Sequence, residues 1–109
     1  MPWFKVDDQL ATHPKVAHAG LAAMGLWVKA GSWCAQHLTD GFVPNGTLRI
    51  LGANKVHAAA LVRAGLWIEV EGGYQFRDWL DYQPSRAHVQ DVREKRRKAG
   101  RKGGRPPSE

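Results

Sequence analysis

Residues 21–41 form a long stretch whose hydrophobic periodicity predicts an α-helix with a very narrow polar stripe. Such a helix has to be covered on most sides, so we expect it at the centre of a small domain or shared with a second copy. Gly25 and Gly31 reduce its stability and permit another part of the chain to approach its backbone closely. The polar residues that share one wedge of the helical wheel are Lys29, Ser32 and Gln36.

Turn and capping residues predict the other elements. We expect Asn54 to cap a helix that Gly65 ends. In the predicted hairpin, alternation separates Leu66, Ile68 and Val70 from Trp67. In chain order the predicted elements are a strand over 3–8, a helix over 12–20, the long helix, a strand within 40–44, helices over 45–52 and 54–65, a β-hairpin over 66–79 and a helix from Ser85.

The net charge of the 109-residue chain is +6, and all of it comes from the C-terminal part. Residues 1–84 contain seven basic and seven acidic side chains, whereas residues 85–109 contain nine basic and three acidic ones. We therefore expect a neutral folded domain over 1–84, a basic helix over 85–99 and a disordered basic tail over 100–109. Cationic segments inside cells usually bind polyanions, and the alternative is a solubilising tail or the remnant of a linker.

The order of these elements, a helix, a strand, two helices and a hairpin, is that of a winged helix-turn-helix. The long helix closes one side of the helix pair and the hairpin closes the other. The expected fold class is therefore α+β and mainly α, with a C-terminal β-hairpin wing, an additional N-terminal strand and a basic C-terminal helix and tail.

Several motifs are spread over residues 1–95. They are Trp3-Phe4-Lys5-Val6-Asp7-Asp8, His13-Pro14-Lys15-Val16, Gly25-Leu26-Trp27-Val28, Gly31-Ser32-Trp33-Cys34, Asp40-Gly41-Phe42-Val43-Pro44 and Asp81-Tyr82-Gln83-Pro84. Together they resemble a small-protein family of actinobacterial phages and prophages, similar to the N-terminal winged-helix part of phage replisome organisers and DnaD-like replication-initiation proteins. The resemblance implies DNA binding in replication initiation or transcription regulation, in the cytoplasm of a bacterial host and in association with its nucleoid.

The helix over 54–65 is the expected recognition helix, and its outward face is rich in alanine. Only Arg63 offers a guanidinium suited to base edges, so we expect double-stranded DNA to be bound with weak sequence specificity. Gly104-Arg105-Pro106 resembles the second half of an AT-hook core, which lies in the minor groove. The candidate DNA contacts are Arg49, Asn54, Lys55, His57, Arg63, Arg93, Arg96, Arg97, Lys98, Arg101, Lys102 and Arg105.

Five tryptophans exceed what a core of this size easily encloses. We expect Trp3, Trp33 and Trp67 to form an interaction surface, used by a homodimer or by a host or phage replication or transcription factor. A protein-interaction module is therefore the alternative to DNA binding. Dense packing of these large rings in the core is an equal alternative.

Residues suited to catalysis or metal binding are sparse. Cys34 and His37 lie one helical turn apart, but no second close pair completes a set of four zinc ligands, and the helix pattern buries Cys34. The sequence has neither a signal-peptide pattern nor an apolar run long enough to cross a membrane. We expect a cytoplasmic protein that is not an enzyme, takes no cofactor or metal and has no membrane partner.

Overall fold

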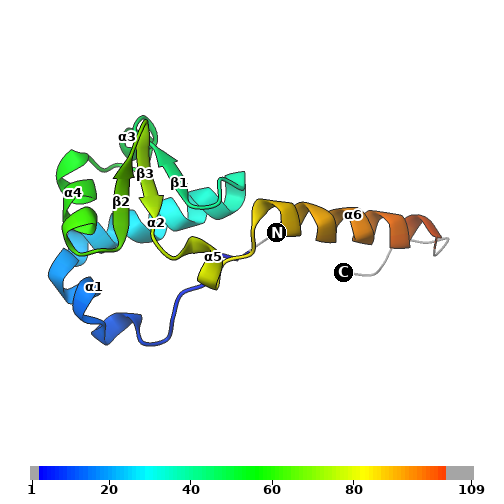
Figure 1. Ribbon diagram of the computed structural model, residues 1–109, viewed down its shortest axis with the longest axis horizontal. Coiled ribbons are helices and arrows are strands. Elements are labelled where there is room, and N and C mark those ends of the chain that lie inside the picture. Colours follow the sequence, from blue (N-terminus) through cyan, green and yellow to red (C-terminus); the bar gives the residue numbers. More distant parts are fainter. Residues whose placement is uncertain (1–2, 103–109) are drawn as a thin grey trace.

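The computed structural model describes residues 3–102 and the side chains of residues 3–100. The chain is α+β and mainly helical, with one three-stranded antiparallel sheet (Figure 1). The predicted helices and the hairpin are confirmed. In chain order the elements are η1 (Leu10–Thr12), α1 (Pro14–Ala19), α2 (Leu21–His37), β1 (Phe42–Pro44), α3 (Thr47–Ile50), α4 (Lys55–Arg63), β2 (Trp67–Val70), β3 (Gly73–Phe76), α5 (Trp79–Tyr82) and α6 (Arg86–Lys102).

The expectation that the long helix α2 is covered on most sides is wrong, because α2 buries one side only, and Leu21 and Val28 are 93% and 48% exposed. The helix contacts α1, α4 and β1, and its residues Ala30 and Cys34 are fully buried. The helix ends at His37, earlier than predicted, because Leu38 and Asp40 adopt the left-handed backbone conformation, with φ of 55° and 53°. These residues turn the chain sharply and allow β1 to return beside the helix that precedes it.

The three strands pair in the order β1–β3–β2, and both pairs are antiparallel. The register sets Val43 of β1 opposite Tyr74 of β3, and Trp67 of β2 opposite Phe76 of β3. All four side chains are buried in the core that the strands share with α2 and α4. Strand β1 approaches β3 so closely at Gly73 that any side chain there would overlap the backbone of Val43.

The burial of Trp67 contradicts its predicted place on an interaction surface. Trp67 is only 1% exposed, and its ring lies 5.4 Å from that of Phe76 and 5.5 Å from that of Tyr74. Ile68 and Val70, on the other face of β2, are exposed instead. An alternating pattern defines two faces of a strand but leaves open which of them meets the core. Here the aromatic face is inward, since burying the larger rings removes more apolar area from water.

The N-terminal segment is not a strand, so that prediction is wrong. Residues 3–7 have no regular secondary structure. The backbone of Lys5 forms hydrogen bonds with a side chain rather than with a neighbouring strand. The Lys5 N–H donates to Gln83 Oε1 at 2.9 Å, and Gln83 Nε2 donates to the Lys5 carbonyl at 2.7 Å. This pairing turns Phe4 into the core, where its ring lies 5.1 Å from that of Trp27 and 5.8 Å from that of Trp79.

Helix α6 starts at the body and projects away from it along the longest dimension of the molecule (Figure 1). Ser85 caps it as predicted, because its Oγ accepts a hydrogen bond from the His88 N–H at 3.1 Å. A second cap comes from the body: the carboxylate of Asp40 accepts from the Arg86 N–H at 2.6 Å. The Val89 side chain, one turn further on, is buried. The start of α6 is therefore attached to the body.

The same helix runs further than predicted, to Lys102, so the boundary expected between 85–99 and 100–109 is wrong in its position. Gly100 lies inside the helix, since one glycine costs about 1 kcal/mol relative to alanine and does not end a helix by itself. Residues 103–109, with Arg105 and its AT-hook-like neighbours, lie outside the described residues.

Candidate nucleic-acid interface

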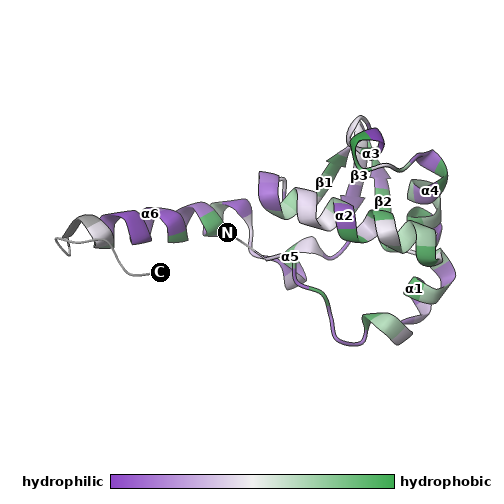
Figure 2. Cartoon of the chain, turned by 180° about the vertical axis from the view of Figure 1, so that it is seen from behind, coloured by the Kyte–Doolittle hydropathy of each residue, from purple (hydrophilic) through white to green (hydrophobic). Residues whose placement is uncertain are grey.

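The predicted basic contacts fall into two groups at opposite ends of the molecule. Helix α4, with Lys55 and Arg63, lies at one end of the long axis, and α6 extends at the other end (Figure 1). The molecule measures 53 × 30 × 21 Å along its principal axes. Figure 2 shows hydrophilic residues along most of α6. The two groups of cations therefore belong to separate surfaces.

The start of α4 is held by two of the predicted DNA contacts, Asn54 and His57. Asn54 Oδ1 accepts hydrogen bonds from the N–H groups of Val56 at 2.9 Å and His57 at 3.4 Å. In return, the Asn54 N–H donates to His57 Nδ1 at 3.4 Å, which completes a capping box. The cap predicted for Asn54 is confirmed. Both side chains serve to fix the helix start, and they present their neighbour Lys55 to solvent.

The outward surface of α3 and α4 carries three predicted cations, Arg49, Lys55 and Arg63, and all three are exposed. Arg63 lies in the last turn of α4, whereas base contacts usually come from the N-terminal part of a recognition helix. The exposed residue in the first turn, beside Lys55, is the apolar Val56. This surface offers dispersed positive charge and few groups that read base edges.

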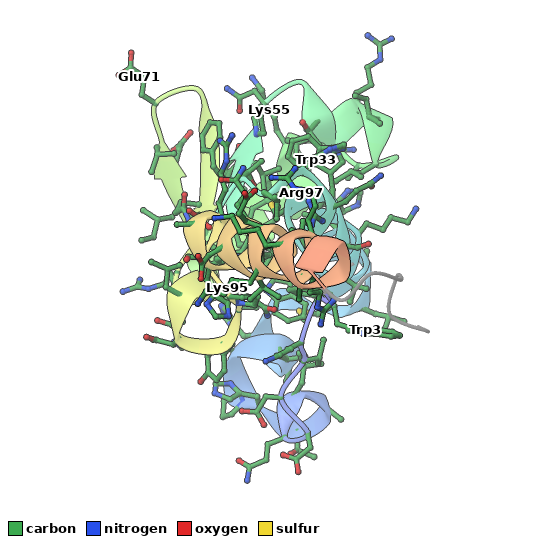
Figure 3. The ribbon with its side chains drawn as sticks, turned by 90° about the vertical axis from the view of Figure 1, so that its right-hand side faces the viewer. Trp3, Trp33, Lys55, Glu71, Lys95 and Arg97 are labelled. Carbon is green, nitrogen blue, oxygen red and sulfur yellow. The ribbon has the colours of Figure 1, made fainter. Side chains whose placement is uncertain are left out.

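The hairpin between β2 and β3 is acidic at its end. Glu69 and Glu71 are both exposed, and Figure 3 shows Glu71 pointing away from the rest of the molecule. A carboxylate at this position repels phosphate, so the hairpin itself is a poor clamp for a nucleic-acid backbone.

Three basic side chains of α6 are paired with acidic residues about one turn away. Lys95 Nζ lies 3.1 Å from the Asp91 carboxylate, and Arg97 and Lys98 both pair with Glu94. Exposed pairs of this spacing stabilise a helix by about 0.2–0.5 kcal/mol each. Figure 3 shows Lys95 and Arg97 leaving the helix in different directions. The predicted contacts Arg97 and Lys98 are therefore partly neutralised by their own helix.

The other two predicted cations within the described side chains of α6, Arg93 and Arg96, face the N-terminal segment. Together with Lys5 and His88 they line a groove of about 250 Å³. Within residues 3–100, none of these four side chains forms an ion pair with a carboxylate. Sequence reasoning missed Lys5, because its place beside α6 depends on the hydrogen bonds of its backbone with Gln83, which lies 78 residues away. The side chains of Arg101 and Lys102 lie outside the described ones.

The predicted interaction surface does not form as a unit. Trp3 is 83% exposed and is the member of the trio that is mostly in solvent. Trp33 is half-buried, and its ring lies edge-on to that of His37 at 4.6 Å. Trp67 belongs to the core. What is left of the predicted surface is the exposed indole of Trp3.

The Cys34 thiol is buried within α2, as predicted, and donates a hydrogen bond to the Phe42 carbonyl at 3.5 Å. Burial raises the pKa of Cys34 from 9.0 to about 11. A thiol held in its neutral form is a poor nucleophile and a poor metal ligand. Among the side chains that the structure describes, no three His, Cys, Asp or Glu residues gather closely enough to hold a metal ion.

Comparison of the chain with protein-family models, curated proteins and solved structures finds no match. Within residues 3–102, none of the helices combines the length and the apolar character needed to span a lipid bilayer.

Proposed function

We propose that this chain is a small winged-helix protein that binds double-stranded DNA, mainly through contacts between its C-terminal basic segment and the phosphate backbone. The observation that carries the proposal is the placement of α6. Asp40 and Ser85 hold its first turn against a body of zero net charge, and its basic side chains extend from there into solvent. A helix of 17 residues is about 25 Å long, comparable to seven base-pair steps of a duplex.

The element order and the sheet support the winged-helix assignment. A helix pair, α3 and α4, is followed directly by a hairpin, and the strand before the pair joins the same sheet in the order β1–β3–β2. In this reading α4 is the recognition helix and the hairpin is the wing. The scarcity of base-reading groups on α4 and the acidic wing both favour binding with weak sequence specificity.

The biological role that we propose is replication initiation or transcription regulation in a phage or prophage, at the nucleoid of the bacterial host. This part rests on the resemblance of the motifs between Trp3 and Pro84. In this role the basic segment supplies affinity for the duplex, and the neutral body positions the protein or dimerises.

The test compares the intact chain with a version that ends at residue 92, which keeps the buried Val89 and the capped first turns of α6. Binding to a fluorescein-labelled duplex is measured by anisotropy at several salt concentrations. If about six cations contact phosphate, log K of the intact chain falls against log salt with a slope near −5. Truncation should remove most of the affinity and flatten the slope. Unchanged binding by the truncated chain contradicts the proposal.

The exposed Trp3 supports a second candidate, a protein-interaction module that dimerises or docks on a replication or transcription factor. The two functions give different results in solution. An intact chain that binds no duplex at low salt, yet forms a dimer by light scattering, favours the second candidate.

A further inference from the structure

The groove beside α6 brings together residues from the two ends of the sequence. Lys5 comes from the N-terminal segment, and Arg93 and Arg96 come from the helix. The position of Lys5 is well defined, because its N–H and its carbonyl are both bonded to the buried side chain of Gln83. The folded body therefore places one cation next to the basic helix.

The spacing of residues along α6 explains why some of its basic side chains have an acidic partner and others have none. One side of the helix carries Val89, Val92, Arg93 and Arg96, because residues three or four positions apart are neighbours on a helix surface. The acidic residue Glu94 lies on another side of the helix, where it forms ion pairs with Arg97 and Lys98. No acidic side chain lines the groove, so its positive charge is not compensated locally.

We propose that this groove is a binding site for a phosphodiester of the nucleic-acid backbone, held by Lys5, Arg93 and Arg96, with His88 at its edge. The proposal rests on the DNA-binding function above and deepens it. Guanidinium groups bind phosphate through paired N–H donors, and the Lys5 ammonium adds a point charge from the opposite wall. The half-buried, apolar Val92 between them suits the sugar that adjoins a phosphate.

The position of the groove beside the basic helix favours a polymer over a free small molecule. The groove runs beside a helix that continues to Lys102, so a chain of phosphates leaving the site meets further positive charge. The N-terminal segment and α6 would then grip the same backbone from two directions.

The test uses two double variants of the full chain that have the same net charge. Arg93→Gln/Arg96→Gln removes two cations from the groove, and Arg97→Gln/Lys98→Gln removes the two cations that pair with Glu94. Binding to a fluorescein-labelled duplex is measured at three salt concentrations. Counterion release is worth about eightfold per phosphate contact at 0.1 M salt, so the groove variant should bind about 60-fold more weakly, with a salt slope shallower by about 1.8.

The control variant should lose much less affinity for the duplex, because it lowers the net charge by the same amount but leaves the groove intact. Lys5→Gln, compared with Lys15→Gln on α1, tests the other wall of the groove, and only Lys5→Gln should weaken binding by about eightfold. Circular dichroism of each variant checks that α6 is intact. Equal losses in the two double variants overturn the groove and leave the proposed function standing. An intact chain that binds no duplex overturns both.

Discussion

Gly31, in the middle of α2, permits a stringent test of how the N-terminal segment packs. Its backbone is buried, and the Cβ of an alanine there would overlap the ring of Phe4. Gly25, on the same helix, is exposed, and an added Cβ would meet nothing within 4 Å. The two glycines are therefore matched in secondary structure and differ in what occupies the space beside them.

The expected effects of the two alanine substitutions have opposite signs. Alanine in place of glycine stabilises a helix interior by about 1 kcal/mol, which is the whole effect expected for Gly25→Ala. At Gly31 the same gain is opposed by overpacking against Phe4, which costs about 1–3 kcal/mol. We expect Gly31→Ala to lower the free energy of unfolding by up to about 2 kcal/mol, a fall in Tm of up to roughly 8–16 °C.

The assay is thermal and urea unfolding, followed by circular dichroism, of Gly25→Ala, Gly31→Ala, Phe4→Ala and the double variant Phe4→Ala/Gly31→Ala. When the Phe4 ring is absent, the overlap disappears, so Gly31→Ala should become stabilising by up to about 1 kcal/mol. A Gly31→Ala effect with the same sign and size in both backgrounds would refute the packing of Phe4 against α2.

Two further predictions concern buried polar groups. Gln83→Leu leaves the Lys5 N–H and carbonyl without their amide partner, and unfolding measurements should show a loss of about 2–3 kcal/mol, against less than about 0.5 for the exposed Gln90→Leu. Equal losses would contradict the pairing. Because burial raises the pKa of Cys34 to about 11, its thiol contributes stability that is present below pH 9 and is lost as the pH rises from 9 to 11. This loss, about 2.5 kcal/mol, should be absent from the unfolding profile of Cys34→Ala, and identical profiles would exclude it.

Much of the local structure follows from the sequence alone. The existence of α2 follows from its hydrophobic periodicity, the start of α4 from Asn54, and the start of α6 from Ser85. Each of these signals operates within a few residues, through helix periodicity or a cap. The ion pairs of Glu94 with Arg97 and Lys98 were also open to prediction, because their spacing of three and four residues is visible in the sequence.

The inward face of β2 and the groove beside α6 could not be predicted from such local signals. Alternation along β2 predicts that Trp67 and Ile68 lie on opposite faces of the strand. Which of the two faces is buried is determined only by tertiary packing, which covers the Trp67 face. The Gln83 amide reaches Lys5 across 78 residues of chain, and Asp40 caps α6 across 46.

Periodicity, capping and charge along the chain thus establish which elements form and that the excess of cations lies at the C-terminal end. The packing of distant segments establishes which strand face is buried, where Lys5 lies and which arginines of α6 line the same groove as Lys5. The physical reason is that the first set depends on interactions between near neighbours, whereas the second depends on contacts that exist only after the chain has closed on itself.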